Sequence, residues 1–144
     1  MTELGRVQLR VQADINPTED PDKVRAAVER IFGELPFRII EEEDGGLLVG
    51  TAEGLKALLP FQELLRREQI RNAARRVLFS GLQGSVVTFY LNKQVAYVGH
   101  ISFSQSEGES PLGPIQVEIE TNNPRELIEW LAPKTPKRQK GLRK

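Results

Sequence analysis

The chain has 144 residues, no cysteine and one histidine, and its 20 basic side chains balance its 20 acidic ones. This length suits one domain that buries roughly 70% of its unfolded surface. The missing cysteines exclude disulfides, thiolate metal sites and a cysteine nucleophile. No basic region followed by an apolar run opens the chain, and no uncharged stretch approaches the ~20 residues of a membrane span. We therefore expect a cytoplasmic protein with no membrane partner.

Charge is distributed unevenly along the chain. Six basic residues and no acid lie between Lys134 and Lys144, so the rest of the chain carries 14 basic and 20 acidic side chains. Proline and lysine in this segment favour a disordered extension. We predict a single domain over residues 1–133 and a basic, disordered tail over residues 134–144, which would attract a polyanion.

The first third of the sequence predicts a strand, a helix and a hairpin. Residues Arg6 to Asp14 alternate between apolar and polar side chains, as in a half-buried strand. Asp20 suits the N-cap of a helix with Pro21 at its first position, and Gly33 suits its end. Two further strands are predicted around a turn rich in glycine: Phe37 to Glu42 and Leu47 to Thr51, joined by Asp44, Gly45 and Gly46.

An arginine-rich segment follows a short helical turn that we expect Pro60 to stop. The predicted helix runs from about Phe61 to Ser80, and its buried stripe consists of Ile70, Ala73, Ala74 and Val77. Arg71 and Arg75 share a neighbouring ridge, while Arg76 lies on the far side. Arg66 and Arg67 fall close to the stripe. They must extend past it, pair with buried carboxylates, or mark a change of helix direction near Gln69.

The next segment predicts a second hairpin. Its strands are Ser85 to Leu91 and Gln94 to Phe103, and Asn92 and Lys93 form a two-residue turn. This register places Lys93 at the hairpin tip and puts Tyr90 and Tyr97 on one partly covered face.

The chain then predicts a loop, a strand and a helix. The loop spans Gln105 to Pro114 and the strand spans Ile115 to Glu120. Asn123 can cap a helix that has Pro124 at its first position and Glu126 at its third. The fold class is therefore α+β, a two-layer sandwich with helices packed on a mostly antiparallel sheet, in the order β-α-β-β-α-α-β-β-β-α.

The sequence offers little for catalysis. His100 is the only histidine, and we expect a structural role for it. Glu118 and Glu120 project from one face of their strand and could pair as acid and base, but they occupy the polar side, where solvated carboxylates are expected. No glycine-rich phosphate loop is present. We predict no catalytic residue, no cofactor and no metal site.

Nucleic-acid binding is better supported by these residue types. Basic side chains can contact phosphates, and the candidates are Arg71, Arg75, Arg76, Lys93, Lys137, Arg138 and Lys140. Tyr90 and Tyr97 could stack on unpaired bases, which favours RNA loops or single strands. The alternative is a homodimeric interaction module in which the tyrosine face is buried against a partner and the arginines make ion pairs.

Several phrases resemble an archaeal family of uncharacterised proteins that is described as an RNA-binding domain. They lie in order between about Val7 and Pro133, and they include Ala13-Asp14-Ile15-Asn16-Pro17, Thr88-Phe89-Tyr90-Leu91-Asn92-Lys93-Gln94, Glu109-Ser110-Pro111-Leu112-Gly113-Pro114 and Trp130-Leu131-Ala132-Pro133. The resemblance implies an α+β fold similar to that of the large-subunit ribosomal protein that holds 5S RNA. It also implies an archaeal cytoplasm and is compatible with a homodimer. The partner that we expect is RNA, either ribosomal or another structured RNA with unpaired bases. The resemblance implies no known reaction, and the basic tail lies outside it.

Overall fold

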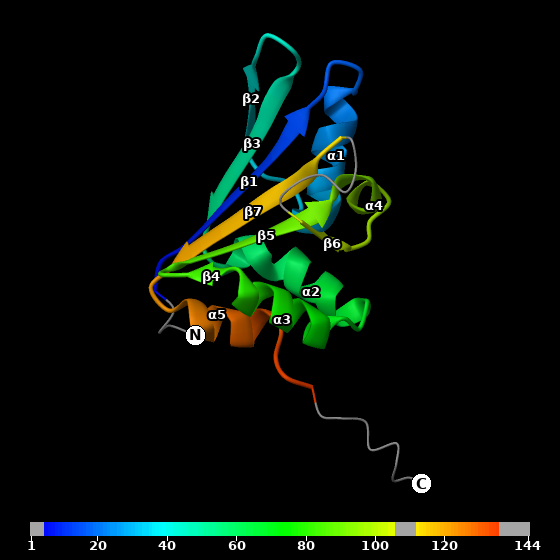
Figure 1. Cartoon of the computed structure of the whole chain (residues 1–144). Helices are drawn as coiled ribbons and strands as arrows, with labels where there is room; N and C mark the ends of the chain where they lie inside the picture. Colours follow the sequence, from blue (N-terminus) through cyan, green and yellow to red (C-terminus); the bar gives the residue numbers. More distant parts are fainter. Residues whose placement is uncertain (1–4, 106–111, 136–144) are drawn as a thin grey trace, which may run out of the picture.

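The structure is a computed structural model that describes residues 5–105 and 112–135. Within these residues, seven strands form one sheet in which every pairing is antiparallel. The order across the sheet is β2-β3-β1-β7-β5-β4, and β6 also pairs with β5 (Figure 1). The strands are β1 (Val7–Ile15), β2 (Phe37–Glu41), β3 (Gly46–Glu53), β4 (Leu82–Gln83), β5 (Val86–Asn92), β6 (Phe103–Ser104) and β7 (Pro114–Thr121).

The helices cover one face of this sheet, which gives the two-layer α+β arrangement that the sequence predicts (Figure 1). The predicted order of elements is confirmed, with the short α4 and β4 as additions. The helices are α1 (Pro21–Phe32), α2 (Leu59–Arg67), α3 (Arg71–Ser80), α4 (Lys93–Tyr97) and α5 (Pro124–Leu131), with a 3-10 turn, η2 (Leu55–Leu58), before α2. Within the described residues, no helix is long and apolar enough to cross a membrane.

The core lies between the helices and the inward side of the sheet. Strand β1 alternates between buried residues such as Val11 and partly or fully exposed ones such as Arg10, because successive side chains point to opposite faces. Three phenylalanines connect the two layers. The ring of Phe61 on α2 lies 5.3 Å from that of Phe32 on α1 and 5.4 Å from that of Phe89 on β5.

The capping signals of the sequence are confirmed. The Asp20 carboxylate accepts a hydrogen bond from the backbone N–H of Asp22, and Pro21 begins α1. The Asn123 side chain accepts from the N–H of Glu126 and donates to its carboxylate, in a variant of the capping box. Gly33 ends α1 with a φ of 77°, a conformation that favours glycine.

The predicted hairpin around Asn92 and Lys93 is wrong. Asn92 instead ends β5 and caps α4, because its side chain accepts a hydrogen bond from the N–H of Val95. Helix α4 packs against α1, and only Phe103 and Ser104 return to β5 as a strand. The second predicted strand is therefore mostly helix and loop.

Pro60 also acts differently from the prediction. It lies in the first turn of α2 rather than ending a helix, because its missing N–H is not needed there. The single helix predicted from Phe61 to Ser80 is two helices, α2 and α3, which meet at Gln69.

Candidate nucleic-acid interface

The junction between α2 and α3 positions the arginines. Gln69 has a φ of 59°, in the left-handed region. The N–H of Ile70 donates to the carbonyl of Leu65, and the N–H of Gln69 donates to that of Arg66. These two bonds form a Schellman ending, which satisfies the last carbonyls of α2 and turns the chain. Of the three alternatives that the sequence left open for Arg66 and Arg67, the structure shows the change of helix direction near Gln69, and both side chains lie on the exposed surface.

Arg75 connects α3 to α5. Its guanidinium donates to both carboxylate oxygens of Glu129, at 2.7 and 2.5 Å, and to the carbonyl of Ala132. It also lies 5.2 Å from the centre of the Phe79 ring. The hydrogen bond from Arg75 lowers the pKa of Glu129. Arg75 therefore has a structural partner already, whereas the sequence placed it among the phosphate contacts.

Arg71 and Arg76 have no ion-pair partner in the part of the chain that the structure describes. Arg76 is exposed and Arg71 is half-buried. Arg71 lines a small hollow together with Arg66 and Pro133. Arg66 pairs with Glu63, and both side chains are at least half exposed, so this pair is easily exchanged for another partner.

The basic tail begins at this same place. The backbone N–H of Thr135 donates to the side chain of Asn72, which lies one turn before Arg76 on α3. The exposed Lys134 adds to the lowered pKa of Glu129, so its charge lies close to α5. The chain thus leaves the domain beside α3 (Figure 1). The tail candidates Lys137, Arg138 and Lys140 lie outside the described residues.

We call this region the α2–α3 basic surface and define it by four cations. Each of them is at least partly exposed and makes no ion pair within residues 5–105 and 112–135. The four are Arg67, Arg71, Arg76 and Lys134. Glu63 lies at the edge of this surface, and Arg66 and Arg67 both lower its pKa, the hydrogen bond from Arg66 being the largest cause.

Lys93 is not at a hairpin tip and is not free. Its side chain is 4% exposed. The ammonium donates to the carbonyls of Asp14 and Leu112, at 2.7 and 2.8 Å, and to the Glu19 carboxylate at 3.1 Å. Three donors thus meet three acceptors from separate segments. This geometry holds the end of β1 and the start of α4 together and leaves no donor for a phosphate.

The two tyrosines do not share a face, which corrects the predicted register. Tyr90 lies on β5 beside Gln116, on the sheet face that the helices leave open. Tyr97 ends α4 on the helical side, and the Arg30 guanidinium lies 5.3 Å from its ring centre. They cannot form one stacking platform, although each remains partly exposed.

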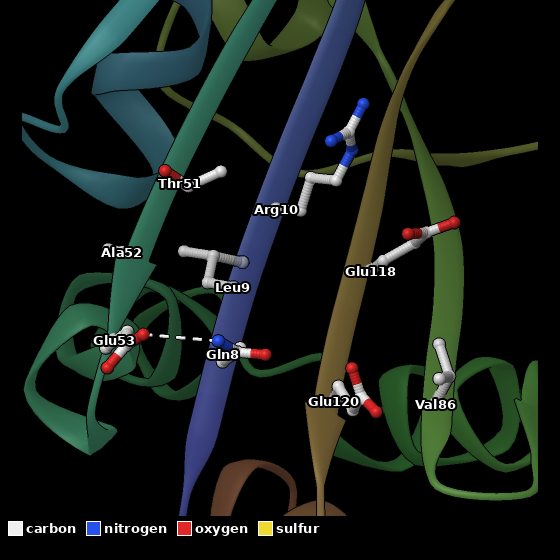
Figure 2. A pocket seen from close by; sticks show the side chains of 9 residues that line it. All are labelled: Gln8, Leu9, Arg10, Thr51, Ala52, Glu53, Val86, Glu118 and Glu120. Atoms are coloured by element: carbon white, nitrogen blue, oxygen red, sulfur yellow. Dashed lines mark hydrogen bonds between the residues drawn. The ribbon is translucent and has the colours of Figure 1, made fainter.

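The open sheet face carries a hollow of about 560 Å³. Figure 2 shows Glu118 and Glu120 extending from β7 beside Arg10 and Gln8 on β1. The side chain of Gln8 donates to Glu53, and that of Gln116 donates to Glu118. Carboxylates outnumber basic side chains around this hollow, so its negative electrostatic potential disfavours the binding of a polyanion such as RNA. No group of three or more metal-ligating acids, histidines or cysteines is found among the described residues.

His100 lies in neither the hollow nor a hairpin. Its Nδ1 is 2.5 Å from a carboxylate oxygen of Glu68, whose other oxygen accepts from the N–H of Ile101. This contact fixes the loop after α4 to the end of α2, which is the structural role that the sequence predicts. Sequence reasoning missed Glu129 and Asn72 as partners, because each lies more than 50 residues from the group it binds.

Comparison with known proteins gives one consistent family. A family described as RNA binding matches residues 8–121. A UPF0201 protein of Sulfurisphaera tokodaii is 45% identical over 130 residues, which cover 88% of each chain. Another, from Saccharolobus solfataricus, is 42% identical over 129 residues, with 90% of this chain and 89% of the relative covered.

Solved structures agree with these relatives. The crystal structure of a UPF0201 protein from Methanococcus jannaschii matches with a TM-score of 0.79 and 34% identity, over 88% of this chain and 99% of that one. A structure from Archaeoglobus fulgidus, at 21% identity and a TM-score of 0.67, shows the same fold over 87% of this chain and 96% of that one. On this evidence the chain belongs to the archaeal UPF0201 family, whose matching domain is described as RNA binding.

Proposed function

We propose that this protein binds RNA, without catalysing a reaction, through the α2–α3 basic surface and the basic tail that begins beside it. One observation carries the proposal. Asn72, which lies one turn before Arg76 on α3, holds Thr135, and Arg71 lines a hollow with Pro133. A segment with five more basic residues and no acid follows Thr135. The family description supports the same partner.

Charge explains why the contact would be made there. The residues before Lys134 carry more acids than bases, so most of the surface repels a phosphate backbone. A polyanion would be steered to a region where positive charge is concentrated and little neutralised by neighbouring carboxylates. Arg75 and Lys93 serve the fold in this proposal, whereas Arg71 and Arg76 contact phosphates.

The ligand class follows from the same arrangement. Phosphate contacts position RNA but do not read its sequence, so we expect affinity for RNA with little sequence preference. Tyr97 on α4 and Tyr90 on the open face lie away from the basic surface. Stacking on them would need a long RNA that passes around the domain. A cytoplasmic location accords with such a partner.

The test is RNA binding measured by fluorescence anisotropy over a series of salt concentrations. The double variant Arg71→Gln/Arg76→Gln should lower affinity roughly tenfold at ~0.1 M salt and reduce the slope of log K against log salt by about one for each phosphate that is no longer neutralised. The matched control is Arg10→Gln/Lys23→Gln, which removes two exposed cations from other faces. Equal effects of the two double variants, or none from either, would contradict the proposal.

A further inference from the structure

Strand β2 is an edge of the sheet with two exposed apolar side chains. It pairs with β3 on one side, and in the described residues no strand pairs with its other side. Ile39 is 49% exposed and Ile40 is 41% exposed, which makes them two of the few large apolar side chains at the surface. Natural sheets normally protect such an edge with charge, proline or a covering element. The opposite edge is formed by the two-residue strands β4 and β6 and offers little to pair with.

The backbone of β2 directs alternate hydrogen-bonding groups toward this edge. The N–H of Glu42 donates to the carbonyl of Gly45, so these residues form a hydrogen-bonded pair. Antiparallel pairing alternates between bonded and non-bonded pairs. In the observed register, Ile40 and Arg38 then bond inward to β3, whereas Phe37, Ile39 and Glu41 direct their N–H and C=O groups toward the outer edge.

The strand is complementary to itself. When two copies meet antiparallel about a two-fold axis normal to the sheet, opposed residues lie on the same face of the joined sheet. Ile40 can then face Ile40 of the second copy, with Arg38 facing Glu42 on both sides of it. Neither Arg38 nor Glu42 has an ion pair within the residues that the structure describes. The outward N–H and C=O groups of Ile39 and Glu41 also face each other in this register.

We propose that the exposed edge of β2 pairs with β2 of a second copy of this chain and joins the two sheets into one. About four backbone hydrogen bonds form between Ile39 and Glu41 of the two copies. Ile40 and the adjacent Leu47 of both copies extend an apolar strip across the open face, flanked by two Arg38–Glu42 ion pairs. An interface built on one short strand is small, so the dimer is reversible and depends on concentration.

A second copy of this chain fits the edge better than an unrelated peptide does, because antiparallel pairing of β2 with itself places Arg38 of each copy opposite Glu42 of the other. This interface lies apart from the tyrosines that the sequence suggested for assembly. It is also remote from the α2–α3 basic surface, so it stands independently of RNA binding.

Cross-linking through single cysteines tests the register, because the natural chain has no cysteine. In the proposed pairing, the Cβ atoms of residue 40 from the two copies lie about 4.5–5.5 Å apart, close enough for a disulfide after small adjustments. Ile40→Cys should form a covalent dimer with oxidised glutathione, whereas Ile39→Cys and the exposed Thr51→Cys should stay largely monomeric. Dimers of all three variants at equal rates, or of none, would overturn the proposal, as would preferential cross-linking of Ile39→Cys.

Charge exchange tests the ion pairs under equilibrium conditions by sedimentation. Arg38→Glu and Glu42→Arg should each weaken dimerisation about tenfold, since each change places two like-charge contacts in the dimer. The double variant Arg38→Glu/Glu42→Arg should restore it. Circular dichroism and thermal unfolding at low concentration verify that each variant is folded. A wild-type protein that stays monomeric at every concentration, or a double variant no better than the singles, contradicts this interface.

Discussion

Gln69 occupies a backbone conformation that costs a side chain about 1–2 kcal/mol relative to glycine. The two hydrogen bonds of the Schellman ending offset this cost, because the left-handed residue lets the last carbonyls of α2 find donors and lets α3 start in a new direction. The residue type explains why this ending is hard to foresee. Glycine is the residue that usually marks such a helix end, and glutamine is a good helix former.

Replacing Gln69 by glycine should therefore stabilise the protein. We expect Gln69→Gly to raise the free energy of unfolding by about 0.5–1 kcal/mol, the relief of strain less the added entropy of the unfolded chain. Urea unfolding followed by circular dichroism measures the difference. Gln69→Ala serves as the control, because it keeps a Cβ atom and should give no such gain. A glycine variant less stable than the alanine variant would rule out this explanation.

Arg66 and Arg75 show how far residue types alone can guide a site prediction. Both are arginines on the same predicted helix, yet Arg75 is held by Glu129 and Arg66 is exposed beside Glu63. Helical spacing predicts which side chains share a ridge, but not which helix packs against that ridge. The distinction between a structural and an available arginine came only from the position of α5.

At the scale of elements, the segment from Val86 to Tyr97 shows why the sequence misled. Its valines and tyrosines favour strands, and Asn92 suits a hairpin turn as well as a helix N-cap. A five-residue helix is too short to show a helical period. Tertiary contacts decide the outcome, because α4 buries Ala96 and Lys93 against α1 and the 112–114 segment. The elements with clear alternation or caps, namely β1, β7, α1 and α5, were predicted correctly, whereas the helix predicted from Phe61 to Ser80 proved to be two helices.

The ammonium of Lys93 should be essential for joining these elements. Lys93→Met should lower the free energy of unfolding by about 2–4 kcal/mol, because it leaves the nearly buried Glu19 carboxylate without its cation. The double variant Lys93→Met/Glu19→Gln should cost less than the sum of the two single changes, since no uncompensated charge remains. Chemical unfolding of the four proteins gives the coupling. Additive costs would mean that the pair does not act as a unit.

At the scale of the whole molecule, charge is separated between the two faces of the fold. The open sheet face carries Glu53, Glu118 and Glu120, whereas the α2–α3 basic surface lies on the helical layer where the tail begins. Sequence counting predicted this separation without placing it in space. The predicted likeness to the ribosomal protein that holds 5S RNA stays a prediction, as do the contacts of the tail.

Removing the tail measures its share of RNA binding. A chain ending at Thr135 keeps the bond to Asn72 and every described element, so its unfolding temperature should match that of the full chain. It lacks five of the basic residues and retains every acid. If these basic residues bind phosphates beside Arg71 and Arg76, affinity should fall at low salt and the salt slope should shrink by about 0.7–0.9 for each phosphate that the tail neutralised.

Combining the truncation with Arg71→Gln/Arg76→Gln separates one continuous site from two independent ones. In a continuous site, binding to the tail holds the RNA close to α3. The loss in log affinity of the combined variant should then differ from the sum of the losses caused by truncation alone and by Arg71→Gln/Arg76→Gln alone. In a full-length chain with glutamine at residues 137, 138, 140, 143 and 144, the loss should approach that of truncation, which assigns the effect to charge rather than to chain length. An unchanged salt slope in both tail variants would remove the tail from the interface and leave α3 alone.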